Sequence, residues 1–146
     1  GCRFEYSKDF LRIIPNQILN SVNITTGPFP GFPTDLQAPF MALMATANGT
    51  SQIKETVFEN RMHHVKELNR MGAKITVNSN IAKVIGVKKL QGKEVIGSDL
   101  RATAALAIAG LSANGKTIVK GLEHLERGYE NFSEKFQEIG ASILKK

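Results

Sequence analysis

The residues best suited to chemistry in this sequence stand at the start of an expected helix. Asp35 follows Thr34, and Gln37 comes three residues after Thr34, the spacing of a capping box in which hydroxyl and amide groups bind free backbone N–H groups. In the first turn, the helix dipole favours the ionised form of the Asp35 carboxyl. Such a carboxylate could accept a proton from a substrate hydroxyl, although acidic residues in first turns commonly only stabilise the helix.

A second expected helix start has Ser98 and Asp99 in the same places, but Arg101 stands where the first has Gln37. An arginine cannot complete the capping box, and its charge opposes the dipole at a helix N-terminus. Local conflicts of this kind concentrate at functional sites, and a guanidinium suits bidentate binding of phosphate or carboxylate. The alternative is a surface ion pair of Arg101 with Asp99 or with Glu94.

Two further arginines occupy equivalent places, each between a strand and the helix that follows it. Arg61 and Arg127 would bring two more anion-binding groups to one side of the scaffold. Taken singly, each is better explained as a solvated or ion-paired side chain, since Glu59, Glu126 and Glu130 are near in sequence. Together with Arg101, they indicate a site for an anionic substrate.

An internal repeat accounts for this duplication. Landmarks of the first half recur in the second half in the same order, with only small insertions between them. The matching segments are 34–38 and 98–102, 47–49 and 113–115, and 71–73 and 139–141. Each copy reads as helix, strand, helix, strand, which predicts an α/β fold of repeated units. We expect residues 1–26 to be the tail of a preceding unit, residues 27–90 the first complete unit and residues 91–146 the second.

Apolar spacing and turn residues predict the elements of each copy. We expect helices at residues 34–47, 62–71, 100–111 and 132–139. We expect strands at residues 3–6, 10–14, 21–25, 52–57, 74–77, 82–87, 117–119 and 142–144.

Composition excludes several classes of protein. The 146 residues contain no apolar run near the roughly 20 residues of a membrane span, and no signal-peptide pattern opens the sequence. The single cysteine, Cys2, leaves no internal disulfide and suits a reducing compartment. The net charge of +6 is spread along the chain, so nucleic acid is not an expected partner. His63, His64 and His124 lack metal-ligand spacing, and we expect no metal and no cofactor.

Four segments resemble motifs of the UDP-N-acetylglucosamine 1-carboxyvinyltransferases, which belong to the enolpyruvyl transferases. They are residues 32–38, 55–61, 98–102 and 126–130, in that family's order and at its spacing. The resemblance implies a bacterial cytoplasmic enzyme that transfers enolpyruvyl from phosphoenolpyruvate to the sugar 3-hydroxyl and releases phosphate during peptidoglycan synthesis. It also implies two domains, each an inside-out α/β barrel of three βαβαββ units, with the active site between them.

The same resemblance assigns roles to matching residues. Asp35 would be the proton acceptor at the attacking hydroxyl, and Val57 would contact the nucleotide sugar. Arg127, expected with Asp35 to be catalytic, would bind phosphoenolpyruvate together with Arg101. Arg61 is a weaker candidate for the same anion cluster.

Asp99 would lie beside the cleft and orient neighbouring groups. The family's proton-donating cysteine, and the lysine and arginine that complete its phosphate site, have no counterpart here, and Cys2 does not stand in that motif. We therefore expect the chain to be a C-terminal portion whose partner is the N-terminal part of the same enzyme.

Two alternatives remain at this point. A related 3-phosphoshikimate 1-carboxyvinyltransferase would share the fold and phosphoenolpyruvate, although the segments 33–35 and 99–101 favour the sugar-nucleotide enzyme. A non-catalytic repeat scaffold or RNA-binding module is the alternative from a different class.

We predict that this polypeptide alone is inactive, because half of the implied site is absent from it. A coupled phosphate-release assay of the isolated chain with phosphoenolpyruvate and UDP-N-acetylglucosamine checks this. Turnover above the no-enzyme background would contradict the prediction.

Overall fold

The computed structural model describes residues 1–15 and 18–145. Residues 16–17 and 146, which fall in the predicted segments 1–26 and 91–146, lie outside the described residues. The elements are β1 (Arg3–Tyr6), β2 (Leu11–Ile14), β3 (Ile24–Thr25), the 3₁₀ turn η1 (Thr34–Leu36), α1 (Gln37–Met44), β4 (Thr50–Lys54), α2 (His64–Arg70), β5 (Lys74–Asn78), β6 (Ile81–Ile85), β7 (Glu94–Ile96), α3 (Leu100–Ser112), β8 (Ile118–Lys120), α4 (Leu122–Glu126) and α5 (Phe132–Glu138). Among these helices, none has the length and apolar character that crossing a bilayer requires.

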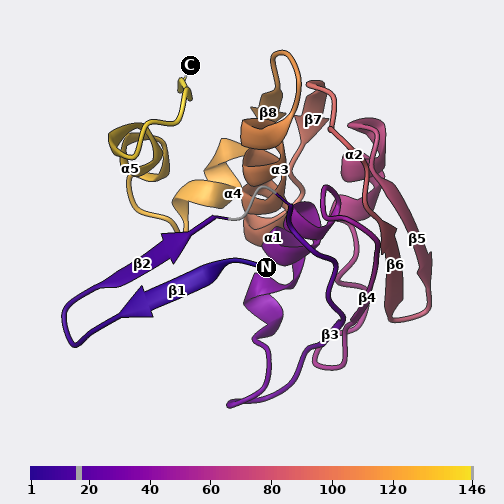
Figure 1. The fold of residues 1–146 in the computed structure, drawn as a ribbon. Helices are drawn as coiled ribbons and strands as arrows, with labels where there is room; N and C mark the ends of the chain where they lie inside the picture. Colours follow the sequence, from indigo (N-terminus) through magenta and orange to yellow (C-terminus); the bar gives the residue numbers. More distant parts are fainter. Residues whose placement is uncertain (16–17, 146) are drawn as a thin grey trace.

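Helices α1 and α3 pack against each other at the centre of the molecule, with strands outside them (Figure 1). Helix α3 is buried along most of its length, and most of its buried side chains are alanines. Small side chains let the two helix backbones approach closely, while Leu106 and Met41 fill the remaining core space. This packing holds the start of α1 beside the start of α3.

A four-stranded sheet covers one side of this helix pair, in the order β3–β4–β6–β5 (Figure 1). Strand β3 is parallel to β4, and β6 is antiparallel to both of its neighbours. Alternate residues of β4 and β6 point into the core, where Ile53, Ala82 and Val84 pack near Leu68 of α2. The sheet fixes the end of β4, and the polar segment 55–61 follows directly after it.

Backbone hydrogen bonds follow the sequence repeat. In the first copy, the Asn48 N–H donates to the Leu19 carbonyl oxygen at 2.7 Å, and in the second the Asn114 N–H donates to the Leu90 oxygen at 2.9 Å. The parallel pairs β3–β4 and β7–β8 continue from these contacts. Strand β3, within the stretch expected as a tail, thus pairs with the following unit, and the divisions after residues 26 and 90 stay a prediction.

The β1–β2 hairpin stands away from the central helices (Figure 1). Phe4, Tyr6, Leu11 and Ile13 lie on one face of it as two cross-strand pairs, and all four are exposed. The β5–β6 hairpin carries apolar pairs in the same antiparallel arrangement, but most of its apolar face is buried in the core.

Most predicted elements form near their expected bounds, with five differences. The strand expected at residues 21–25 is reduced to Ile24–Thr25, and the strand expected at residues 52–57 is Thr50–Lys54, so residues 55–57 lie beyond its end. The strand expected at residues 142–144 is wrong, because that segment has no strand neighbour among the described residues. The short elements β7 and α4 were missed, since three and five residues show too little periodicity. The first helix opens with the turn η1, so its α-helical part begins only at Gln37.

Close backbone approach makes Gly86 irreplaceable in this packing. A Cβ on Gly86 would overlap the Ala47 carbonyl oxygen, whereas a Cβ on Gly27 meets no atom within 4 Å. We predict that Gly86→Ala lowers the free energy of unfolding by about 2 kcal/mol or more, because backbone must move to admit the methyl group. Gly27→Ala, the matched control, should change it by less than about 0.5 kcal/mol. Urea unfolding followed by circular dichroism checks both values, and equal effects would contradict the packing argument.

Candidate functional site

The Asp35 carboxylate lies between two arginines that come from different repeat units. Arg101 Nε donates to Asp35 Oδ1 at 2.6 Å, and Arg61 Nη1 donates to the same oxygen at 3.1 Å. The Asp35 side chain is 63% exposed, against 19% for Arg61 and 31% for Arg101. No hydrogen bond to Asp35 Oδ2 is found in residues 1–15 and 18–145, so this second oxygen is left to accept a hydrogen bond from a ligand.

This arrangement sets the charge of the site. The Arg101 hydrogen bond is the main influence that lowers the Asp35 pKa below its ordinary value, against a smaller opposing effect of burial, and Arg61 lowers it further. The same contact raises the pKa of Arg101. Asp35 is therefore ionised at neutral pH, and the outer nitrogens of Arg101 remain available to an anion.

The predicted capping box at Thr34 is wrong. Helix α1 begins after the turn η1, and neither start has a side-chain cap. The Thr34 hydroxyl instead donates to Glu55 Oε2 at 2.8 Å and accepts from Arg61 Nη1 at 2.8 Å. Gln37 is buried and donates to the Met62 sulfur. The 3₁₀ turn moves the first helical N–H groups away from Thr34, which frees its hydroxyl for the site.

The second helix start keeps the cap that it was expected to lose. Asp99 Oδ1 accepts from the backbone N–H groups of Arg101 and Ala102 at 2.9 and 3.0 Å. Burial raises the Asp99 pKa, but these bonds and one from the Ser98 hydroxyl outweigh it and lower the pKa. Arg101 uses its backbone N–H for the cap and its side chain for Asp35, and the alternative ion pair with Asp99 or Glu94 does not form.

Glu55 is a site residue to which sequence reasoning gave no role. It is 2% exposed, and its Oε1 accepts from the Thr26 hydroxyl at 2.8 Å and from the Val57 and Phe58 N–H groups at 2.8 and 3.2 Å. Burial raises the Glu55 pKa, but the Thr26, Val57, Thr34 and Phe58 bonds lower it by more. The signal in the sequence that could have pointed to Glu55 is its position as an acidic residue directly after a half-buried strand.

Apolar side chains flank the charged groups on the same loop. Val57 and Phe58 are both exposed, and the Arg61 guanidinium carbon lies 4.1 Å from the centre of the Phe58 ring. This is a cation–π contact, which orients the flat guanidinium over the ring. Val57 therefore stands close to the charged cluster along the chain but makes no described contact with it.

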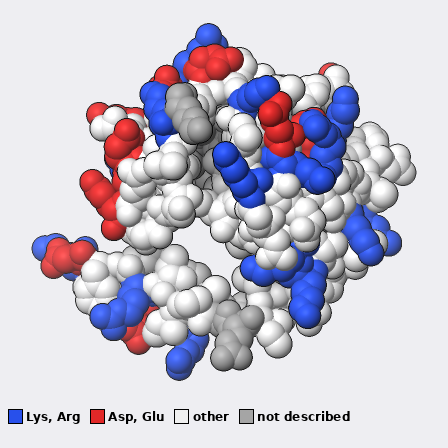
Figure 2. Space-filling model, turned by 90° about the horizontal axis from the view of Figure 1, so that it is seen from above, with Lys and Arg blue, Asp and Glu red and all other residues white. Residues whose placement is uncertain are grey.

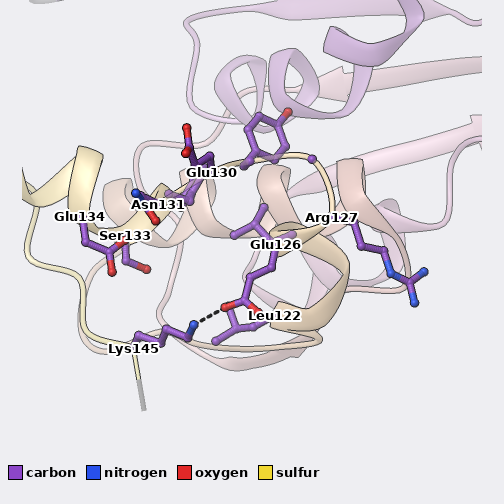
Figure 3. Close-up of a pocket in the computed structure, with 12 residues that line it drawn as sticks. Leu122, Glu126, Arg127, Glu130, Asn131, Ser133, Glu134 and Lys145 are labelled. Atoms are coloured by element: carbon purple, nitrogen blue, oxygen red, sulfur yellow. Dashed lines mark hydrogen bonds and ion pairs between the residues drawn. The ribbon is translucent and has the colours of Figure 1, made fainter.

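Arg127 is not brought into the cluster. It follows α4 as an exposed side chain, forms no ion pair within the described part of the chain, and points away from Glu126 and Glu130 (Figure 3). A hollow of about 560 Å³ lies beside it, lined by residues 122, 125–134 and 145. The loop does reach the start of α3, because a Cβ on Gly128 would lie 2.7 Å from Leu100 Cδ2.

The side chains that could bind a metal ion do not gather into a site in the described residues. No group of three or more His, Cys, Asp or Glu side chains that could hold an ion is found outside residues 16–17 and 146. His64 is buried, with Nε2 3.3 Å from the Met41 sulfur. Lysine and arginine side chains are scattered over the face in Figure 2 rather than gathered in one patch.

A sequence model of the family described as EPSP synthase (3-phosphoshikimate 1-carboxyvinyltransferase) matches residues 3–136. The chain belongs to the EPSP synthase family. Curated relatives confirm the resemblance stated above: a Prochlorococcus marinus UDP-N-acetylglucosamine 1-carboxyvinyltransferase 2 is 59% identical over 98% of this chain. The UDP-N-acetylglucosamine 1-carboxyvinyltransferase of a Nostoc species is 58% identical over 97% of it. The chain covers 34% and 32% of these two relatives, about a third of their length.

Solved structures confirm the predicted α/β, enolpyruvyl transferase-like fold of this EPSP synthase family member. The enolpyruvyl transferase NikO from Streptomyces tendae matches with a TM-score of 0.86 and 29% identity, over 97% of this chain and 33% of that one. EPSP synthase from Acinetobacter baumannii matches with a TM-score of 0.69 and 14% identity, over 100% of this chain and 34% of that one, which supports the fold alone.

The buried His64 makes stability depend on pH. Burial lowers its pKa to about 4, with the Asp99 charge raising and His63 lowering it by smaller amounts. The unfolded chain takes up this proton near pH 6.5 and the folded chain only near pH 4, so the free energy of unfolding falls as the pH drops through that window. We predict a loss of about 3 kcal/mol from this group, in proportion to its shift.

Urea unfolding between pH 7 and pH 5 measures this slope. His64→Leu should flatten it, and His63→Gln at the exposed neighbour should change it only slightly, because His63 makes the smallest contribution to the shift. An equal slope in the wild type and His64→Leu would show that another group carries the dependence.

Proposed function

We propose that the complete protein transfers the enolpyruvyl group of phosphoenolpyruvate to the 3-hydroxyl of UDP-N-acetylglucosamine and releases phosphate. The observation that carries this is Asp35, an exposed carboxylate with one oxygen held by Arg61 and Arg101 and the other open. The names of relatives 58–59% identical to the chain support the choice of acceptor.

In this reaction, Asp35 Oδ2 accepts the hydrogen of the sugar hydroxyl and orients its oxygen toward C2 of phosphoenolpyruvate. The lowered pKa makes Asp35 a weak base for the free hydroxyl. As the new C–O bond forms, the hydroxyl becomes strongly acidic, so proton transfer to Asp35 accompanies bond formation. The methylene carbon takes its proton in the same addition from an acid outside this chain, and loss of a proton from that carbon together with phosphate then restores the double bond in the product.

The arginines serve the anionic partner. The outer nitrogens of Arg101 bind the carboxylate or phosphate of phosphoenolpyruvate and stabilise charge in the tetrahedral addition intermediate. Arg127, exposed on the loop that abuts the start of α3, joins it when substrate binds. Asp99 orients Arg101 by capping the helix that carries it. Val57 contacts the nucleotide sugar.

We infer that the whole enzyme acts in the cytoplasm, in peptidoglycan precursor synthesis, and so serves cell-wall biogenesis, cell shape, the cell cycle and cell division. Its catalysis requires the N-terminal part of the same enzyme and neither nucleic acid nor a cofactor. The relatives' names and the short coverage of their length support this placement.

A 3-phosphoshikimate 1-carboxyvinyltransferase is the second candidate, favoured by the description of the matching family. Phosphate release by the complete protein, with phosphoenolpyruvate and either UDP-N-acetylglucosamine or shikimate 3-phosphate, separates the two. Our proposal requires turnover when phosphoenolpyruvate is paired with UDP-N-acetylglucosamine and no turnover when it is paired with shikimate 3-phosphate. Turnover with shikimate 3-phosphate, or with neither acceptor, would overturn it.

Replacement of Asp35 tests the mechanism. Asp35→Asn keeps the shape but cannot accept the proton, so we predict that kcat/KM falls by about 10²–10⁴-fold in the complete protein. Steady-state phosphate release checks this value. Asp9→Asn removes an exposed aspartate in the β1–β2 turn and should leave kcat/KM unchanged. A loss of less than about threefold in Asp35→Asn would remove Asp35 from the proton transfer.

A further inference from the structure

Glu55 is a buried carboxylate that the proposed reaction leaves without a task. Its two oxygens accept four hydrogen bonds, from two hydroxyl groups and two backbone N–H groups. No ion pair to Glu55 is present among the described residues, so its charge is not balanced by direct contact with a cation. The nearest cation in this hydrogen-bond network, Arg61, is reached through the Thr34 hydroxyl.

The hydroxyl of Thr34 has one hydrogen, and Glu55 decides where it points. An ionised carboxylate can only accept, so Thr34 donates its hydrogen to Glu55 Oε2 at 2.8 Å. The oxygen lone pairs of Thr34 then face Arg61, whose Nη1 donates to them at 2.8 Å. Because the same Nη1 also reaches Asp35, the direction of one hydroxyl fixes the arginine that touches the proton acceptor.

The contacts close into a ring. From Glu55, the path runs through Thr34 to Arg61, then across the cation–π contact to Phe58, whose N–H returns to Glu55. A guanidinium held at one nitrogen could still rotate, but the Phe58 ring restricts its plane. The pKa of Glu55 is lowered, so its carboxylate stays ionised at neutral pH and this closed cycle of contacts is maintained.

We propose that Glu55 is a positioning residue for the transferase site, acting through Thr34 to hold Arg61 against Asp35 and through its backbone bonds to hold the loop of Val57. The inference rests on the proposed function and deepens it. Glu55 touches no reacting atom in this scheme. It links the side chains that handle the anion and the proton to the loop that contacts the nucleotide sugar, so one buried charge aligns both parts.

Glu55 acts through two arms, the bond to Thr34 and the bonds to the backbone of the Val57 loop, and their loss should have different kinetic effects in the complete protein. Thr34→Val removes only the hydroxyl, so kcat should fall about tenfold while KM for UDP-N-acetylglucosamine stays within about twofold. Thr34→Ser retains the hydroxyl and should restore kcat to within about twofold of the wild type. Glu55→Ala removes every acceptor and so loses both arms, and kcat should fall while that KM should rise. Thr76→Val and Glu94→Ala, matched changes at exposed residues, should alter neither constant.

A double-mutant cycle shows whether Thr34 acts through the arginine. In an Arg61→Gln background, Thr34→Val should cost less than about twofold in kcat, because the side chain that it positions is already lost. A full tenfold cost in that background, or a failure of Thr34→Ser to rescue, would overturn the inference. If Glu55→Ala does not fold, the Thr34 variants decide the question. Absence of turnover in the wild type would instead overturn the proposed function.

Discussion

The contact between Arg101 and Asp35 is the interaction on which the candidate site depends. It joins the starts of two helices from two copies of the same unit, and it exists because α1 and α3 pack closely through alanines. An exposed ion pair on its own contributes little to stability. Its importance here is geometric, since it places a carboxylate and two guanidinium groups where neither repeat unit could assemble them alone.

The two helix starts show how a duplicated fold acquires different functions at equivalent positions. Both retain a hydroxyl residue followed by aspartate. In the second copy, Asp99 caps its helix and leaves the side chain of Arg101 free to cross to the other unit. In the first, a 3₁₀ turn releases Thr34 and Asp35 from capping, so both side chains serve the site. A structural role in one copy thus corresponds to a proposed chemical role in the other.

Sequence reasoning reached the fold class and the residues of the charged cluster because both depend on local patterns. Helical periodicity, the repeat and the chemistry of arginine were enough to select Asp35, Arg61 and Arg101. The same reasoning also selected Arg127, which the structure leaves outside the cluster. The hydrogen-bond partners could not be obtained this way, since they join residues from distant segments. The role of Glu55 depends on Thr26 and Thr34, about 20 to 30 residues away, and no spacing rule connects them.

The exposed face of the β1–β2 hairpin has a practical consequence for the chain in solution. Two aromatic and two aliphatic side chains stand on one side of a short two-stranded ribbon, whereas most of the apolar face of the β5–β6 hairpin is buried. Water-exposed apolar strands recruit other strands, including those of identical molecules. The hairpin therefore offers an apolar surface for pairing between identical chains, so measurements on the isolated chain should be compared at one protein concentration.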